Sequence, residues 1–358
     1  MVLYQPIKHI TMKNYFLLLL AFVSFSGFSQ VSFGARHVGK PSDLKPKALE
    51  EFKASTTIFV LSDVIDADQY AKILEETWTV TPYKIVPQSE YDLQEYYNKN
   101  YSIAELVGFK RSKTTKMGSV VHSLHTYINI GLYDAETIDE KLSKVKAKKE
   151  KKREEKINEI FRNNKKPIAK IYLFPTSDFV NTALSEEKEV IVEKMYTENV
   201  FFNYSTGFLK NYFQQTNGLI EKGETYWMYE KDHDPKKIAG LTTSKLYVPN
   251  YITQRTNAFT AEISDGEKKD VEKLFSKYDY DYEFISTEDL DKAIEENKEF
   301  YYLRYARANA ERFLQVVNSK TGEVVYREYI TGLSYNLKAK NLGELSDVIA
   351  KSAKKLAK

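Results

Sequence analysis

The sequence predicts an α+β fold in which one unit of strand, helix, strand, meander and helix occurs twice. A short apolar strand pattern appears as "TTIFVLSD" at 56–63 and again as "SKLYVPNY" at 244–251, and the same order of elements follows each copy. The chain also contains 27 Tyr and 20 Phe residues, which favour half-buried strands. The prediction is therefore a sheet-containing fold that arose by internal duplication.

The first copy begins with the strand at 56–63 and continues into an amphipathic helix. Residues 66–78, "DADQYAKILEETW", place apolar side chains at helical spacing. Further strands are expected at 82–93, 101–109, 125–134 and 167–175. The segment 206–223 predicts a closing helix, and we expect its apolar residues on one face. These residues are Phe208, Leu209, Tyr212, Phe213, Leu219 and Ile220.

The second copy repeats this order. A helix is predicted at 264–278, and strands are predicted at 280–290, 300–308, 312–320 and 324–330, before a closing helix at 341–356. The period-two run "KYDYDYEF" at 277–284 is typical of a strand with one buried face. Gly322 in "NSKTGE" indicates a tight hairpin between two of the strands. The two copies span 50–223 and 240–358, and residues 224–239 connect them.

A charged insertion occupies 136–166, where the second copy has its tight turn. Helix-forming Lys, Arg and Glu residues dominate it, which predicts a projecting charged helix or a helical hairpin. Ile138, Leu142 and Val145 start an apolar stripe that Lys149 and Lys152 interrupt. This interruption disfavours a sustained coiled coil.

The N-terminus predicts export. Residues 1–29 contain Lys13, an apolar run that starts at Tyr15, and Gly27 and Ser29 in the spacing of a signal-peptidase site. A buried or anchoring helix is the alternative. Cleavage would reduce the formal charge of +3 to 51 basic against 50 acidic residues, which gives no general attraction to nucleic acid. We expect a periplasmic, outer-membrane-associated or extracellular protein whose stability depends on its core, because the chain has no cysteine.

The sequence contains no catalytic motif that we could assign. It has no Gly-x-Ser-x-Gly elbow and no phosphate-binding Gly-Lys-Ser/Thr loop. His122 and His125 are three residues apart in a predicted strand and would face opposite sides of the sheet. Asp232, His233 and Asp234 are adjacent in the connector, which is typical of a solvated loop. We therefore predict no catalytic residue, no cofactor and no metal.

The candidate partner contacts are Lys148, Lys149, Lys152, Arg153, Arg304, Arg307 and Trp227. The first four belong to the charged insertion, which could contact an acidic partner or anionic lipid headgroups, or could be only a solvated helix. Arg304 and Arg307 lie near Arg312 and would form either an anion site or surface ion pairs. Trp227 would pack between the units or offer a stacking surface.

The order of elements within each copy, from "TTIFVLSD" or "SKLYVPNY" to the closing helix, resembles two known periplasmic α+β domains. These are the amino-terminal domain of TolB and the periplasmic domain of the curli-secretion channel subunit. The whole chain also resembles secreted bacterial envelope proteins without an assigned function. The resemblance implies an adaptor module in an envelope complex, and it identifies no particular residue.

Three functional hypotheses follow. The first is an exported, non-enzymatic adaptor or binding module for an envelope protein or a cell-surface component, with peripheral membrane contact as a further option. The second is a secreted hydrolase whose carboxylates meet in a cleft between the repeats. The third is a structural or assembly role through the helix at 136–166. The identity of the partner and the oligomeric state stay open.

Overall fold

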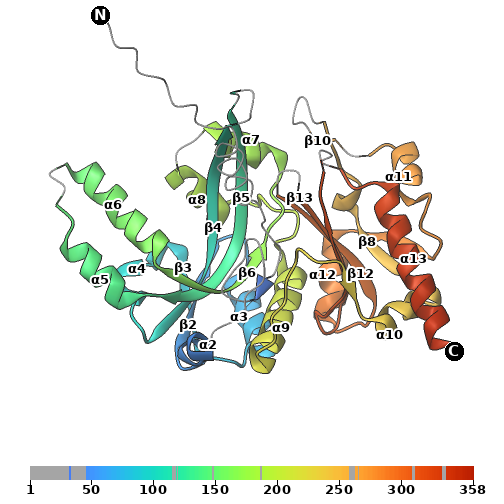
Figure 1. Ribbon diagram of the computed structural model, residues 1–358, viewed down its shortest axis with the longest axis horizontal. Helices are drawn as coiled ribbons and strands as arrows, with labels where there is room; N and C mark the ends of the chain where they lie inside the picture. Colours follow the sequence, from blue (N-terminus) through green and yellow to red (C-terminus); the bar gives the residue numbers. More distant parts are fainter. Residues whose placement is uncertain are drawn as a thin grey trace, which may run out of the picture.

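A computed structural model describes residues 32–33 and 46–358, apart from 115–117, 119, 147–148, 186–187, 258–262, 265, 309–310 and 333–335. The predicted signal peptide at 1–29 lies outside the described residues. The described part of the chain combines helices with two six-stranded mixed sheets and a two-stranded ribbon (Figure 1). The predicted α+β class is therefore confirmed.

The first sheet has the strand order β1-β6-β5-β4-β2-β3. Its strands are β1 (Ser32–Phe33), β2 (Thr56–Leu61), β3 (Tyr83–Pro87), β4 (Tyr101–Thr114), β5 (Val120–Tyr133) and β6 (Lys165–Tyr172). β2 runs parallel to β3 and β4, and all other neighbours are antiparallel. Both faces of β2 are buried, as expected for a parallel strand inside a sheet. Ile58 and Val60 lie on one face and Phe59 and Leu61 on the other, and all four are buried.

The second sheet has the order β11-β8-β12-β13-β14-β7. Its strands are β7 (Asp232–His233), β8 (Leu246–Pro249), β11 (Tyr282–Ile285), β12 (Tyr301–Ala308), β13 (Glu311–Asn318) and β14 (Val324–Ile330), and the ribbon pairs β9 (Arg255–Thr256) with β10 (Ile263–Ser264). β8 is parallel to β11 and β12, and the remaining pairs are antiparallel. Both sheets thus share one order and one set of directions, starting from a two-residue edge strand. This agreement supports duplication, which stays an interpretation.

The helices of the first unit are α2 (Pro46–Lys53), α3 (Ala67–Thr77), η1 (Gln88–Glu90), α4 (Leu93–Tyr96), α5 (Ala135–Ser143), α6 (Glu150–Asn163), α7 (Ser177–Ser185), α8 (Lys188–Thr197) and α9 (Thr206–Lys222). The helices of the second unit are α10 (Pro235–Ile238), η2 (Ala239–Thr242), η3 (Asn250–Thr253), α11 (Lys268–Phe275), α12 (Thr287–Glu295) and α13 (Ala339–Leu356). α9 packs on α3, and α13 packs on α11 and α10. Sequence reasoning missed α7 and α8, which pack on β5 and β4.

One expected strand differs from the structure at both ends. The strand expected over 277–284, and up to 290, begins only at Tyr282, because α11 ends at Phe275 and the chain turns before it enters the sheet. It ends at Ile285, because α12 begins at Thr287. Tyr278 nevertheless is buried, so the aromatic alternation reflects a packed turn as well as a strand. The hairpin expected at Gly322 joins β13 to β14, and Gly322 has φ 69°, a left-handed conformation that suits glycine.

α9 lies between the two units and is buried nearly all around (Figure 1). The prediction of a single apolar face is wrong, because α12 of the second unit covers the side opposite α3. The helix therefore buries the polar residues Lys210, Asn211, Gln215 and Asn217 as well as its apolar ones. Buried polar groups need partners, and here the partners come from both units.

The polar contacts of α9 join the two units. Lys210 Nζ lies 2.7 Å from Glu76 Oε2 on α3 and 3.1 Å from the amide oxygen of Asn297, which follows α12. Asn211 Nδ2 donates to the carbonyl of Ser319 in the second unit at 2.8 Å. A single apolar cluster also runs through both sheets. The units thus share one core.

Candidate functional site

The predicted contact residues of the insertion lie on an arm that projects from the first unit. The arm consists of α5 and α6, which connect the antiparallel neighbours β5 and β6 and extend away from the second unit (Figure 1). Lys149, Lys152 and Arg153 are exposed at the start of α6. Lys148 lies outside the described residues. The described contact residues of the insertion therefore gather at the end of the arm.

The tip of the arm, which we define as residues 144–153, is strongly basic. It contains seven Lys or Arg residues and a single acid, Glu150. Lys144 pairs with Glu140 one turn earlier, at 2.5 Å. Among the described residues of the tip, no other ion pair lies within 4.0 Å. The positive charge of the tip is thus left largely uncompensated within the described structure.

α6 begins with charges that its own dipole disfavours. The N-terminus of a helix carries partial positive charge, so a cation there costs about 0.3–1 kcal/mol. Lys149 is the residue before the first turn, and its side chain makes no capping hydrogen bond. Lys151, Lys152 and Arg153 follow within the first turn beside Glu150. An anion bound at the tip would reduce this repulsion.

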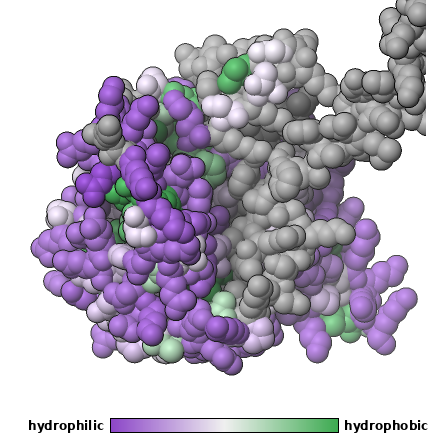
Figure 2. Space-filling view, turned by 60° about the vertical axis from the view of Figure 1, so that its left-hand side comes forward, coloured by the Kyte–Doolittle hydropathy of each residue, from purple (hydrophilic) through white to green (hydrophobic). Residues whose placement is uncertain are grey.

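A hollow of about 250 Å³ lies between the arm and α4, and we call it the arm hollow. Its lining consists of Gln94, Tyr97, Leu142, Val145, Arg153, Ile157 and Phe161. Most of these side chains are apolar, and Gln94 and Arg153 supply the polar part. Figure 2 turns the arm side of the molecule forward and shows mostly hydrophilic side chains with small apolar patches between them. The exposed surface of the hollow is more polar than apolar, but its aliphatic and aromatic side chains make it a binding candidate on such a hydrophilic face.

Aromatic packing fixes the shape of the arm hollow. Phe161 is buried and meets the ring of Tyr97 edge-on, with 5.1 Å between the ring centres, and the ring of Tyr133 at 6.0 Å. The Tyr97 hydroxyl donates to Asp139 Oδ1 on α5 at 2.6 Å, and this hydrogen bond raises the pKa of Tyr97. The arm is therefore held against the body of the first unit near its base.

Arg153 lines the arm hollow without a partner for its guanidinium group. Within the described part of the chain, its side chain makes no hydrogen bond and no ion pair. An arginine fork matches a carboxylate with two parallel hydrogen bonds. The arm therefore combines aliphatic and aromatic side chains with a guanidinium group that makes no contact within the described part of the chain.

Arg304 does not form the expected surface ion pair. It is 0% exposed on β12, where it donates to Gln315 Oε1 at 2.7 Å and to Gln215 Oε1 of α9 at 3.2 Å. Its guanidinium also lies 4.8 Å from the centre of the Tyr212 ring. No described carboxylate is within 4.0 Å. The prediction failed because β12 is buried on both faces, so alternation along the strand does not expose this residue.

Arg307 and Arg312 also make hydrogen bonds within the protein. Arg307 is half-buried, donates to Thr256 Oγ1 at 2.6 Å, and lies 5.4 Å from the ring centre of Phe174. Arg312 is buried and donates to the carbonyl of Asn336 at 2.8 Å. The three arginines thus hold loops and helices to the second sheet. Arg307 and Arg312 are neighbours across β12 and β13, whereas the Arg304 side chain lies buried against α9.

Trp227 is buried, 4% exposed, in the connector. Its ring lies 5.0 Å from that of Tyr229, which in turn contacts Phe313 of β13 and Tyr329 of β14. The side chain therefore packs onto the second sheet. In this arrangement it is not available as a stacking surface for a partner.

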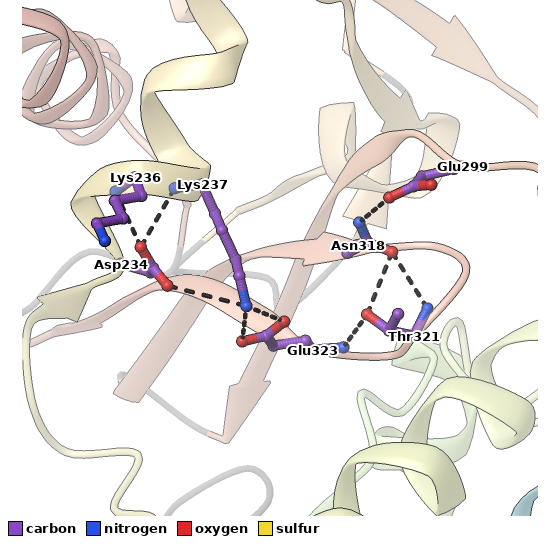
Figure 3. A network of polar contacts seen from close by, with 7 residues as sticks. All are labelled: Asp234, Lys236, Lys237, Glu299, Asn318, Thr321 and Glu323. Carbon is purple, nitrogen blue, oxygen red and sulfur yellow. Dashed lines mark hydrogen bonds and ion pairs between the residues drawn. The ribbon is translucent and has the colours of Figure 1, made fainter. Parts of the chain in front are cut away.

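Asp234 belongs to a network of polar contacts around the start of α10 (Figure 3). Asp234 accepts a hydrogen bond from the backbone of Lys237 at 3.2 Å and lies 3.8 Å from its Nζ. The same Nζ lies 2.5 Å from Glu323, and Asn318 accepts from the Thr321 backbone at 3.1 Å. These contacts fasten the connector to the turn between β13 and β14.

The surface beside this network is open. A hollow of about 520 Å³ is lined mostly by polar residues, among them Asp232, His233 and Lys236. Asp232 pairs with Arg327 at 3.1 Å. In the described residues, no group of three or more His, Asp or Glu side chains could hold a metal ion. The charged groups here stabilise the edge of the sheet.

A small hollow between the units contains two carboxylates. It measures about 130 Å³ and is lined by Glu76 of α3 and Glu295 of α12, among others. Glu76 pairs with Lys210 at 2.7 Å, and Glu295 accepts from Thr206 Oγ1 at 2.5 Å. Both carboxylates are already engaged by side chains of the protein. The arm is the better candidate because the Arg153 guanidinium makes no contact within the described part of the chain.

Sequence reasoning identified the arm but missed the arm hollow. The sequence pattern shows the apolar stripe of Leu142 and Val145, but Tyr97, which lines the opposite side of the hollow, lies far away in the chain. The residues around Tyr97 in the sequence do not indicate that it packs against the insertion. The available signal was the stripe itself, because apolar residues in a charged insertion require something to cover them.

The sequence matches no family model, no curated protein and no solved structure. Within the described residues, no helix is long and apolar enough to cross a membrane. Function must therefore be argued from the geometry of the arm.

Proposed function

We propose that this protein is an exported adaptor that captures an acidic partner protein through its arm. The observation that supports the proposal is the arm itself, which presents a basic tip beside a hollow lined partly by aliphatic and aromatic side chains. Such a surface attracts anionic groups over a distance, and apolar contacts then hold them. An export signal at 1–29, as the sequence predicts, would put the partner in the envelope or outside the cell.

Local energetics support the same proposal. Cations in the first turn of α6 weaken the helix, and natural sequences keep unfavourable local choices mainly at functional sites. A partner with negative charge would turn these residues into favourable contacts. A purely solvated helix would be more stable with acids in their place.

The test uses an arm-deletion variant of the mature chain, residues 30–358. Residues 135–164 are replaced by "SKTGE", the turn that joins β13 to β14 in the second unit. Proteins crosslinked to the intact chain in envelope fractions should be lost with this variant, and their capture should fall steeply with added salt. Circular dichroism must show that the variant stays folded.

Capture that survives deletion of the arm would overturn the proposal. Fractionation of cells that express the full chain tests the export prediction separately. Finding the uncleaved chain in the cytoplasmic fraction would contradict export.

A further inference from the structure

The arm hollow has a lining that specifies its ligand in more detail. Leu142 and Val145 contribute aliphatic carbon from one side, and Ile157 contributes it from α6. All three are half-buried, so part of each apolar surface still meets solvent. Covering this surface with another aliphatic group removes it from water, which is favourable.

The size of the arm hollow favours a side chain over a metabolite. Its volume of about 250 Å³ is below the roughly 300–1,000 Å³ of small-molecule sites. It is ample for one aliphatic side chain presented by a peptide. In helix-in-groove and extended-peptide complexes, single apolar anchors of this kind provide specificity.

The polar boundary of the arm hollow selects negative charge. Arg153 lines it with a guanidinium group that no described side chain engages, and Lys149 and Lys152 continue the positive charge along the tip. An arginine fork binds a carboxylate more specifically than it binds a neutral group. Aliphatic and acidic character are therefore required in the same short segment.

We infer that the arm hollow binds one aliphatic side chain of an acidic peptide segment, while a carboxylate of the same segment pairs with Arg153. This inference rests on the proposed adaptor function and names the chemistry of its partner. An anionic lipid surface would pair with the basic tip, but a flat surface has no side chain that would fill the hollow. The partner is therefore a protein.

The test compares two fluorescein-labelled peptides, EEELEEE and EEESEEE, on the intact mature protein. They carry the same charge and differ in one aliphatic side chain. We expect the Leu peptide to bind about tenfold more tightly, as measured by fluorescence anisotropy at low salt. Equal affinities would overturn the inference about the hollow and would leave the adaptor proposal to the capture experiment.

Two variants locate the binding site of the Leu peptide. Val145→Trp fills the arm hollow and should lower the affinity for EEELEEE to that for EEESEEE. Ser143→Trp adds the same ring at an exposed position that does not line the hollow, and it should leave the preference intact. A preference that persists in Val145→Trp would place the aliphatic contact elsewhere and overturn the inference.

The charged contact has its own variants. Arg153→Gln should weaken both peptides by a similar factor of about ten, because both offer carboxylates. The double change Lys149→Glu and Lys152→Glu tests the adaptor proposal, and it should weaken the binding of both peptides and the capture of envelope proteins together.

Vesicles of phosphatidylglycerol and phosphatidylcholine provide the lipid control. If they bind and neither peptide does, the inference is overturned in favour of a membrane contact.

Discussion

At the scale of single residues, Asp291 of α12 connects the second unit to α9. Its Oδ1 accepts from Ser205 Oγ at 2.7 Å and from the backbone of Gly207 at 3.0 Å, so a side chain of one unit caps a helix of the other. Burial raises the pKa of Asp291 to about 7, although both hydrogen bonds favour the carboxylate. We therefore expect the contact between the units to depend on pH near neutrality.

The sign of this dependence can be tested. In the unfolded chain an aspartate has a pKa of about 3.9, so between that value and about 7 the folded protein binds the extra proton. The free energy of unfolding contributed by this group is then largest below pH 4 and decreases as the pH rises to 7. Asp291→Asn should flatten this part of the profile, as measured by urea unfolding from pH 5 to 8. An unchanged slope would contradict the assignment.

Arg304 gives a second prediction at this scale. Its side chain fills space between β12 and α9 and donates to two buried amide oxygens. Arg304→Ala should lower the free energy of unfolding by roughly 2–4 kcal/mol, because it leaves a cavity and unpaired acceptors. Arg304→Met should cost less, since it restores most of the volume and removes an unpaired buried charge. Denaturant unfolding of both variants measures the difference, and equal losses would show that volume is unimportant.

At the scale of elements, the first turn of α6 is predicted to limit the stability of the arm. Lys152→Glu replaces a cation at the helix N-terminus by an anion and sets it four residues before Lys156. Both changes favour the helix, and we expect a gain of about 0.3–1 kcal/mol in the stability of the arm. Hydrogen exchange of residues 150–163 should slow. Lys156→Glu is the control, because it creates the same i,i+4 pair with Lys152 without placing an anion in the first turn. It should give only the smaller gain of the pair, about 0.2–0.5 kcal/mol.

Sequence reasoning succeeded best at predicting helices and strands, and it failed where burial depends on contacts between distant elements. The strands and the insertion between β5 and β6 could be predicted, because periodicity and turn residues are local signals. The burial of Lys210 on α9 could not, because its contact Asn297 follows α12, much later in the chain. Arg304 misled because its partner Gln215 lies far away in the chain, on α9. The composition of the insertion predicts the arm. It does not predict the hollow, because the hollow forms only where Tyr97 packs opposite the arm.

At the scale of the whole molecule, α9 is expected to make the two units unfold together. One apolar cluster spans both sheets, and α9 packs on α3 and α12 at once. The chain contains two tryptophans, and they report on different parts of it. Trp78 packs against Phe213 of α9 in the first unit, and Trp227 packs with Tyr229 near the second sheet.

Single-tryptophan variants therefore test this cooperativity. In Trp78→Phe and Trp227→Phe proteins, the fluorescence transitions in urea should have the same midpoint. Gly207→Ala should then separate the transitions, because its Cβ would lie 2.6 Å from Asp291 Oδ1 and 2.8 Å from the Asp291 Cα, forcing α12 away from α9.

Gly218→Ala is the matched control on the same helix. Its Cβ meets no atom within 4 Å, so it should raise stability by up to about 1 kcal/mol and keep the midpoints together. Different midpoints in the proteins that retain Gly207 would mean that the units fold independently and that α9 belongs to the first unit alone.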